Sequence, residues 1–215
     1  MNRESQSGFL FKRDMMAKIN KLLQGFDSFR KQYAESNVNL MAKLAQAGHN
    51  PEIMMIACSD ARVDPALLFQ CDPGELFILR NVANLVPPYE CDHRHHGTSA
   101  ALEFGICYLK VKHLVILAHS QCGGIQAHLT ETKLVQNDFL GDWLSLLHDS
   151  EKSHHPDVCA KNALLFSYQN CLTFPWIQTA LNQGVLKIHL WFFDILQASL
   201  KSYDFDLGWV DPTFE

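Results

Sequence analysis

The chain has 215 residues, of which 47% are hydrophobic, 19% charged and 11% aromatic. This composition excludes a disordered or collagen-like chain and indicates a globular protein with a substantial core. Its 18 basic and 23 acidic residues give a net charge of -5, so we expect no nucleic-acid partner, because binding to a duplex requires a basic face.

The first part of the chain predicts helices. Residues 1–14 are mostly polar and show no secretion signal, so we expect a flexible N-terminal extension there. From Met15 to Tyr33 apolar residues recur at intervals of three and four, which predicts an amphipathic helix. A second helix is predicted from Asn39 to Ala47, because Gly48 follows it.

Four short apolar runs follow, with helical stretches between them. We predict strands at Ile53 to Ala57, Leu76 to Leu79, His113 to Ala118 and Leu186 to Phe193. A helix that begins near Gly97 connects the second strand to the third. Strands that alternate with helices predict an α/β fold with a mostly parallel central sheet covered by helices on both faces. No linker divides the chain, so we expect a single domain over residues 1–215.

The seven cysteines and eleven histidines are the unusual counts. An odd number of cysteines without a secretion signal predicts reduced thiols and a cytoplasmic protein. The longest stretch without charged side chains, Asn162 to Leu186, contains too many polar residues to cross a bilayer. We therefore expect buried helix and turn there, and no membrane span.

Three candidate metal ligands follow two of the predicted strands. Cys58 comes directly after the first strand, and His119 and Cys122 come after the third. In such folds ligands bind at the carboxyl ends of the strands. Taken singly, each residue is more often part of the core, but two thiolates and an imidazole together suit Zn²⁺ and leave a fourth position for water. Gly123 and Gly124 would let the backbone pass close to that position.

Asp60 and Arg62 lie two and four residues after Cys58. A carboxylate so close to a metal would coordinate it unless a bidentate pair with Arg62 held it away. The alternative is a surface ion pair of little energetic value. The two residues alone favour this alternative.

Several segments, in their order along the chain, resemble the β-class carbonic anhydrases. They are Cys58 to Val63, Pro73 to Phe77, Arg80 to Asn84, Gly97 to Phe104 and Ala118 to Gly124, with weaker similarity at Leu172 to Trp176 and Leu186 to Ile195. The resemblance implies a zinc enzyme that reversibly hydrates carbon dioxide to bicarbonate and a proton. It also implies a homodimer or larger homo-oligomer, in which the helices of residues 15–47 form an arm that packs on the partner subunit.

The resemblance also assigns roles to the site residues. Cys58, His119 and Cys122 would hold the zinc, and Asp60 with Arg62 would form the catalytic dyad. Zinc-bound hydroxide would attack carbon dioxide, Asp60 would accept the hydrogen bond of this hydroxide, and Arg62 would keep Asp60 charged and off the metal.

The family contains open sites and sites that the aspartate closes by becoming the fourth ligand. The closed form is associated with bicarbonate held near a Trp, an Arg and a Tyr. Arg80 matches that Arg, but Met55 stands at the position of the Trp. We therefore expect the open type.

Four further positions are expected at the substrate, in addition to Gly123. His49 stands where the family usually has a Gln that donates a hydrogen bond to the substrate, which predicts a pH-dependent affinity. Phe77, Val82 and Phe104 would form an apolar surface for carbon dioxide, partly across the dimer. Each of these three is equally plausible as an ordinary core residue, and open-type plant relatives have Tyr at the position of Phe104.

Two alternative functions keep the metal site. One is a related zinc hydrolase that acts on carbon disulfide through a narrowed entrance. The other is a structural zinc or interaction protein without turnover, which a missing dyad or a fourth Cys or His ligand would indicate. The segment His93 to His96 resembles a metal-binding tract, but consecutive side chains point apart, so we interpret it as a solvated loop.

Overall fold

The structure is a computed structural model that describes residues 3–36, 38–130, 139–147 and 155–213. It divides into two units, residues Met1–His49 and Asn50–Glu215. The smaller unit consists of α1 (Arg3–Tyr33) and α2 (Leu40–Ala47). The larger unit contains the sheet and the candidate site.

The second helix has the ends that the sequence predicts. The Asn39 side chain accepts a hydrogen bond from the backbone N–H of Ala42 at 3.0 Å and so caps the start of α2. Gly48 follows the last helical residue with φ 74°, a conformation that glycine adopts without strain.

The first helix begins earlier than predicted. α1 starts at Arg3, so residues 3–14, which we expected to be a flexible extension, are helical in the structure. The apolar periodicity identifies only the segment from Met15 onward. A nucleated helix extends at little cost for each added residue, and no proline interrupts residues 3–14.

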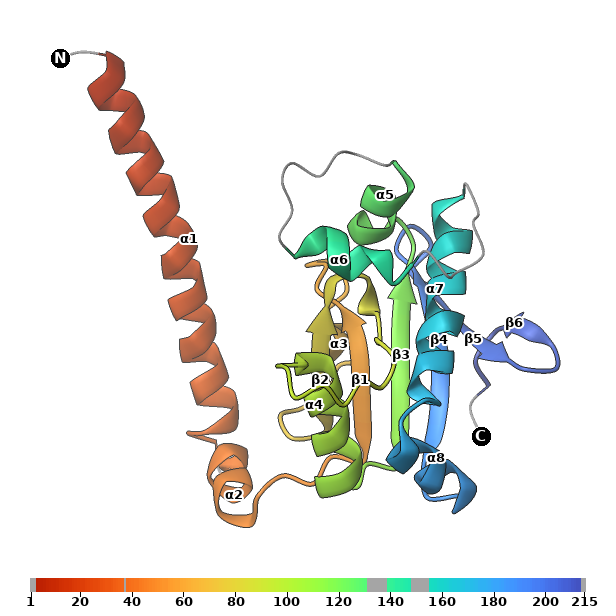
Figure 1. Cartoon of the computed structure of the whole chain (residues 1–215). Helices are drawn as coiled ribbons and strands as arrows, with labels where there is room; N and C mark the ends of the chain where they lie inside the picture. Colours follow the sequence, from red (N-terminus) through yellow and green to blue (C-terminus); the bar gives the residue numbers. More distant parts are fainter. Residues whose placement is uncertain (1–2, 37, 131–138, 148–154, 214–215) are drawn as a thin grey trace. The chain divides into compact units, whose positions relative to one another are not determined.

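The larger unit is built on one six-stranded sheet with the order β2-β1-β3-β4-β5-β6 (Figure 1). The strands are β1 (Ile53–Cys58), β2 (Leu76–Asn81), β3 (His113–His119), β4 (Lys187–Asp194), β5 (Ser199–Asp204) and β6 (Gly208–Val210). β1 to β4 pair in parallel, and β5 and β6 are antiparallel to their neighbours. The predicted α/β fold with a mostly parallel sheet is confirmed.

The two antiparallel strands were not predicted. Ser199–Asp204 mixes polar and apolar residues and Gly208–Val210 is very short, so neither forms the continuous apolar run of a strand buried on both faces. Aromatic packing holds this hairpin: the Trp209 ring centroid lies 5.2 Å from that of Tyr203 and 6.0 Å from that of Phe192.

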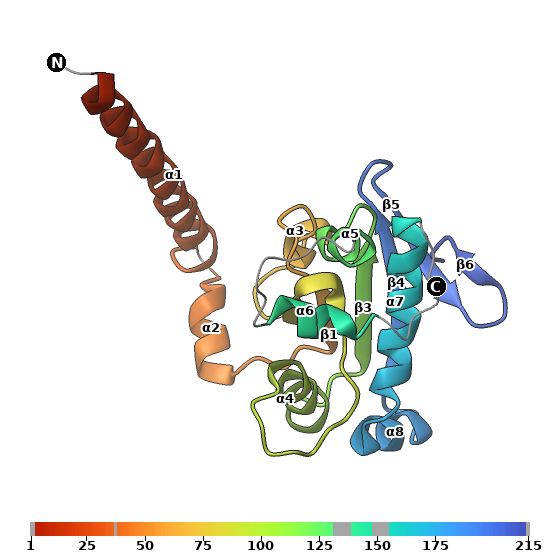
Figure 2. The ribbon, with the colours of Figure 1, turned by 45° about the horizontal axis from the view of Figure 1, so that its top comes forward.

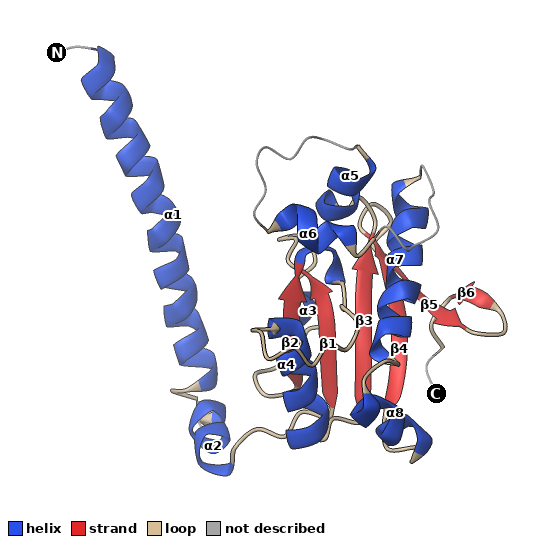
Figure 3. Ribbon diagram, in the orientation of Figure 1, coloured by secondary structure: helices blue, strands red, loops and turns tan. Residues whose placement is uncertain are grey.

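Helices and short turns connect the strands. The helices are α3 (Pro65–Leu68), α4 (Gly97–Glu103), α5 (Gly123–Leu129), α6 (Leu140–Ser145), α7 (Pro156–Cys171) and α8 (Pro175–Asn182). A 3₁₀ turn, Val82–Asn84, follows β2, and a π-helical turn, Phe104–Tyr108, continues α4. Figures 2 and 3 show α7 in front of β4, and Figure 2 shows α6 in front of β1.

The core explains the continuous apolar runs. Side chains at alternate positions of β1 and β3, including Met54 and Ile116, pack against α4, α7 and α8 on one face of the sheet. On the other face, Met55 and Leu117 pack with Trp191 and with side chains at α3. Because both faces of the central strands are buried, the sequence does not alternate between apolar and polar residues there.

Two expectations about the chain concern membranes and disulfides. None of the described helices is both long and apolar enough to cross a membrane. The stretch Asn162 to Leu186 forms the end of α7, all of α8 and the turns beside them. All seven cysteines are among the described residues, and each is a free thiol.

Candidate metal centre

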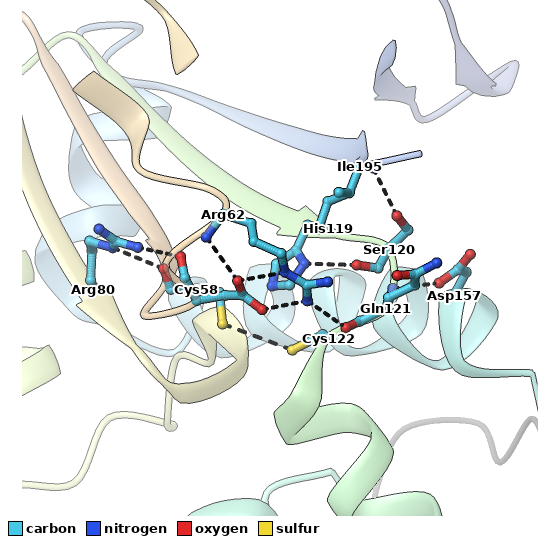
Figure 4. Close-up of polar contacts among 10 residues, drawn as sticks. Cys58, Arg62, Arg80, His119, Ser120, Gln121, Cys122, Asp157 and Ile195 are labelled. Carbon is cyan, nitrogen blue, oxygen red and sulfur yellow. Dashed lines mark hydrogen bonds and ion pairs between the residues drawn. The ribbon is translucent and has the colours of Figure 1, made fainter. Parts of the chain in front are cut away.

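The candidate ligands come from the carboxyl ends of two neighbouring strands. Cys58 is the last residue of β1, and His119 is the last residue of β3, its parallel neighbour. Cys122 follows three residues later and directly precedes α5. Because parallel strands end at the same edge of the sheet, the fold brings residues from distant parts of the chain to one point (Figure 4).

The three side chains have the spacing of ligands around one ion. The sulfur atoms of Cys58 and Cys122 lie 3.9 Å apart, and the ligand atoms of both cysteines and of His119 lie within 4.8 Å of one another. Two sulfur atoms bound tetrahedrally to zinc at about 2.3 Å would be about 3.8 Å apart. All three residues are buried, so their ligand atoms form a buried group with the spacing that a metal ion requires.

The histidine ring has one nitrogen free for a metal. Its Nδ1 lies 2.9 Å from the carbonyl oxygen of Ser120. A carbonyl only accepts hydrogen bonds, so Nδ1 carries the proton, and in the neutral ring Nε2 keeps its lone pair. His119 is fully buried, and its Nε2 has no hydrogen-bond partner among the described residues. A bound cation would satisfy this atom, since an unpaired buried acceptor is costly.

One of the two thiols loses its proton readily, and the other retains it. The Cys122 thiol donates to the sulfur of Cys58. This bond, together with smaller contributions that include the backbone N–H groups of Asp60 and Ala83, lowers the pKa of Cys58 to about 4, although burial opposes the shift. The resulting thiolate raises the pKa of Cys122. Without a metal the pair therefore holds one shared proton, which a bound dication would release.

Asp60 and Arg62 form a bidentate ion pair beside this pocket. Arg62 Nε donates to one carboxylate oxygen at 2.9 Å and Nη2 to the other at 2.7 Å. The side chain of Asp60 is 16% exposed and that of Arg62 is 46% exposed, so the carboxylate of the pair is largely shielded from water while the guanidinium is not. The guanidinium holds the pKa of Asp60 well below its usual range, and the backbone N–H of Arg62 adds to this effect.

Arg80 braces the loop that carries Asp60. Its Nε donates to the carbonyl oxygen of Cys58 at 2.9 Å, and its Nη2 to that of Asp60 at 2.7 Å. Its Nη1 bonds the carboxylate of Asp64 at 2.6 Å, and Asp64 in turn caps α3. The three nitrogens of this guanidinium are thus all engaged with the protein.

The turn after β2 packs tightly against α5. Ala83 and Asn84 both have positive φ angles, 63° and 49°. A Cβ on Gly124 would lie 2.8 Å from a methyl group of Val82 and 3.2 Å from the Cβ of Ala83, so this position requires glycine. A Cβ on Gly123 would meet nothing within 4 Å, so Gly123 is not required by packing.

The residues expected at the substrate have different surroundings in the structure. The rings of Phe77 and Phe104 contact each other, with centroids 5.7 Å apart, whereas Val82 lies against Gly124 next to the metal ligands. His49 is exposed and belongs to the N-terminal unit. A substrate role for these residues and for Gly123 stays a prediction.

Sequence reasoning gave no role to three residues that support the site, although one of them, Gln121, lies within the segment Ala118 to Gly124. Gln121 and Asp157 extend the hydrogen bonds of Arg62 into α7. Asp157 lies 36 positions from Gln121 in a different element and carries no motif, so only the fold could reveal it. Asp64 was also missed, although an aspartate directly before Pro65 is a recognisable signal for a helix start.

A second group of possible ligands lies outside this site. Single ligand atoms of Glu90, Asp92 and His96 also lie within 4.8 Å of one another. The carboxylate of Asp92 already has two partners in the protein, because His96 Nε2 lies 2.6 Å and Arg94 Nε 3.4 Å from its oxygens. His93 and His95 are exposed, as expected for a solvated loop.

Comparison with known proteins points to one family. A family model described as carbonic anhydrase matches residues 53–200. The carbonic anhydrase of Synechococcus elongatus is 32% identical over 203 residues, which cover 86% of this chain and 74% of that protein.

Solved structures agree with this similarity. The β-carbonic anhydrase CcaA superposes with a TM-score of 0.82 at 30% identity, covering 93% of this chain and 94% of the other. A structure from work on two tetrameric β-carbonic anhydrases of the ascomycete Sordaria macrospora gives 0.75 at 28% identity, covering 86% and 96%. The residues that match the family model, 53–200, extend from β1 into β5 and include all three candidate ligands.

Proposed function

Because the chain belongs to the β-class carbonic anhydrase family, we propose that it hydrates carbon dioxide at a zinc ion held by Cys58, His119 and Cys122. The observation that supports the metal is the buried, unpartnered Nε2 of His119 beside two thiols 3.9 Å apart. When bound there, zinc would act as a Lewis acid that makes hydroxide available near neutral pH.

Asp60 orients the attacking oxygen. Its low pKa keeps the carboxylate charged at neutral pH, so it accepts a hydrogen bond and cannot donate one. Arg62 donates hydrogen bonds to both carboxylate oxygens. These bonds would keep the carboxylate from coordinating the metal. The dyad therefore aligns the nucleophile with the carbon atom of carbon dioxide.

We propose an open site, which Asp60 does not close. Closure would require the carboxylate to leave two hydrogen bonds with Arg62. It would also require Arg80 to bind bicarbonate, but its nitrogens already hold Cys58, Asp60 and Asp64. Activity that falls steeply and cooperatively with pH, and falls further with added bicarbonate, would contradict the open type.

The apolar side of α1 supports a second copy of the chain as a partner. Leu22, Leu23 and Phe26 are each more than 60% exposed along α1. Large apolar side chains that are exposed together on one helix commonly mark a surface that another protein surface covers. Light scattering on the wild type and on a Leu22→Lys variant tests this: we expect an oligomer for the wild type and a smaller species for the variant.

Stopped-flow hydration of carbon dioxide, on protein whose zinc content is measured, tests the activity. We expect one zinc per chain and turnover far above the buffer rate. One zinc per chain without turnover would favour the structural zinc protein instead. Turnover of carbon disulfide without hydration of carbon dioxide would favour the hydrolase.

A further inference from the structure

Gln121 occupies a constrained position between two of the metal ligands. It lies two residues after His119 and directly before Cys122, and its φ angle is 55°. A residue with a side chain is disfavoured in this left-handed conformation. Other contacts must therefore help to hold the backbone at Gln121.

Two hydrogen bonds hold the backbone of Gln121, one through its N–H group and one through its carbonyl oxygen. The N–H of Gln121 donates to Oδ1 of Asp157 at 3.1 Å, and the carbonyl oxygen of Gln121 accepts from Nη2 of Arg62 at 3.0 Å (Figure 4). Asp157 lies in the first turn of α7, directly after Pro156. A carboxylate is stabilised at this end of a helix, so the position suits Asp157 as an acceptor.

The bond to Gln121 matters because Arg62 is otherwise held only locally. Its side chain is 46% exposed. Among the described residues, its other side-chain hydrogen bonds go to Asp60, two positions away in the same loop. The carbonyl of Gln121 is 59 positions away and joins the dyad to the loop that carries His119 and Cys122.

We propose that Asp157 is a positioning residue of the hydration reaction. It holds the Gln121 backbone so that the carbonyl binds Arg62, and Arg62 in turn holds Asp60 at the nucleophile and off the metal. This inference rests on the proposed function of the dyad and adds to it a residue from a separate helix.

The first test replaces the acceptor. Asp157→Ala removes it, and we expect kcat/KM for carbon dioxide to fall about three- to tenfold, the size of one lost hydrogen bond. Asp157→Asn keeps an oxygen acceptor and should restore most of the activity. Asp204→Ala is the control, because Asp204 also accepts from the backbone, in its case from two N–H groups in the β5–β6 turn. All three variants should keep wild-type zinc content and melting temperature.

The second test asks whether Asp157 acts through Arg62. We expect Asp157→Ala to cost three- to tenfold in the wild type and almost nothing in an Arg62→Ala background. An equal loss in both backgrounds, a parallel loss of zinc, or an Asp157→Asn enzyme as slow as Asp157→Ala would overturn the inference and leave the dyad intact. If Arg62→Ala itself keeps full activity, the proposed dyad and this inference both fail.

Discussion

The sulfur atoms of Cys58 and Cys122 lie 3.9 Å apart although the residues are 64 positions apart in the chain. The pair joins the end of β1 to the loop after β3, and His119 completes the group from the end of β3. No fourth Cys or His joins these three ligand atoms among the described residues. Three protein ligands would leave one position of a tetrahedral metal ion for water, as a catalytic centre requires.

Replacing Cys58 tests the metal assignment. Cys58→Ser removes a thiolate ligand, so we expect loss of more than nine-tenths of the bound zinc and of the activity together. Metal analysis after dialysis, combined with stopped-flow assays, gives both numbers. Cys91→Ser, at an exposed thiol, should change neither. Full zinc content in the Cys58→Ser protein would show that the metal lies elsewhere.

Replacing Asp60 should separate metal binding from turnover. Asp60→Asn has nearly the same shape but no charge, so it cannot be a strong acceptor next to Arg62. We expect unchanged zinc content and a fall in kcat/KM of about a hundredfold. Asp92→Asn is a close control, because Asp92 also accepts from the backbone and side chain of an arginine two positions later. Wild-type activity in Asp60→Asn would remove this residue from the mechanism.

Two adjacent glycines should respond differently to alanine. Gly124→Ala pushes a methyl group into Val82 and Ala83, and we expect it to destabilise the protein by about 1–3 kcal/mol and to weaken zinc binding. Gly123→Ala meets no protein atom within 4 Å, so its free energy of unfolding should match the wild type. Urea unfolding of both variants checks this. A slower Gly123→Ala enzyme with normal stability would support the predicted place of Gly123 at the substrate.

A histidine pair on the sheet makes stability depend on pH. Nδ1 of His113 lies 3.0 Å from Nε2 of His189, and burial, aided by the charges of His113 and Lys187, lowers the pKa of His189 below 6.5. As the pH falls below 6.5, the unfolded chain takes up a proton that the folded chain resists, so the free energy of unfolding decreases.

The variant His189→Gln isolates this effect. Urea unfolding at pH 7.5 and 5.5 should show a smaller loss for the variant than for the wild type, because glutamine does not titrate. Equal losses in the two proteins would mean that other groups cause the acid sensitivity.

His49 offers a test of substrate binding. If it donates to the substrate where relatives use glutamine, a change in its protonation should change the affinity for bicarbonate. Because glutamine carries no titratable proton, we expect His49→Gln to flatten the pH dependence of KM. A pH profile identical to the wild type would exclude this role.

The sequence predicts the parallel strands of the sheet well and its antiparallel strands poorly. The central strands β1 and β3 are buried on both faces, so their apolar runs are unmistakable. The hairpin of β5 and β6 is polar, short and held by a few aromatic contacts, which leave little periodic signal.

The same division holds at the site. Motif similarity identifies Cys58, His119 and Cys122, because metal ligands are restricted to a few residue types. The carbonyl of Gln121 and the side chain of Asp157 are absent from any such pattern, since a backbone acceptor has no preferred residue and Asp157 comes from another helix.

The pairing of β1 with β3 also determines when, during synthesis of the chain, the three candidate ligands can come together. During synthesis Cys58 leaves the ribosome 61 residues before His119, and contacts between such distant segments form late in folding. The nascent chain therefore carries an unpaired thiol long before its partner strand exists. A metal ion could therefore bind all three candidate ligands only after the chain beyond β3 has been made.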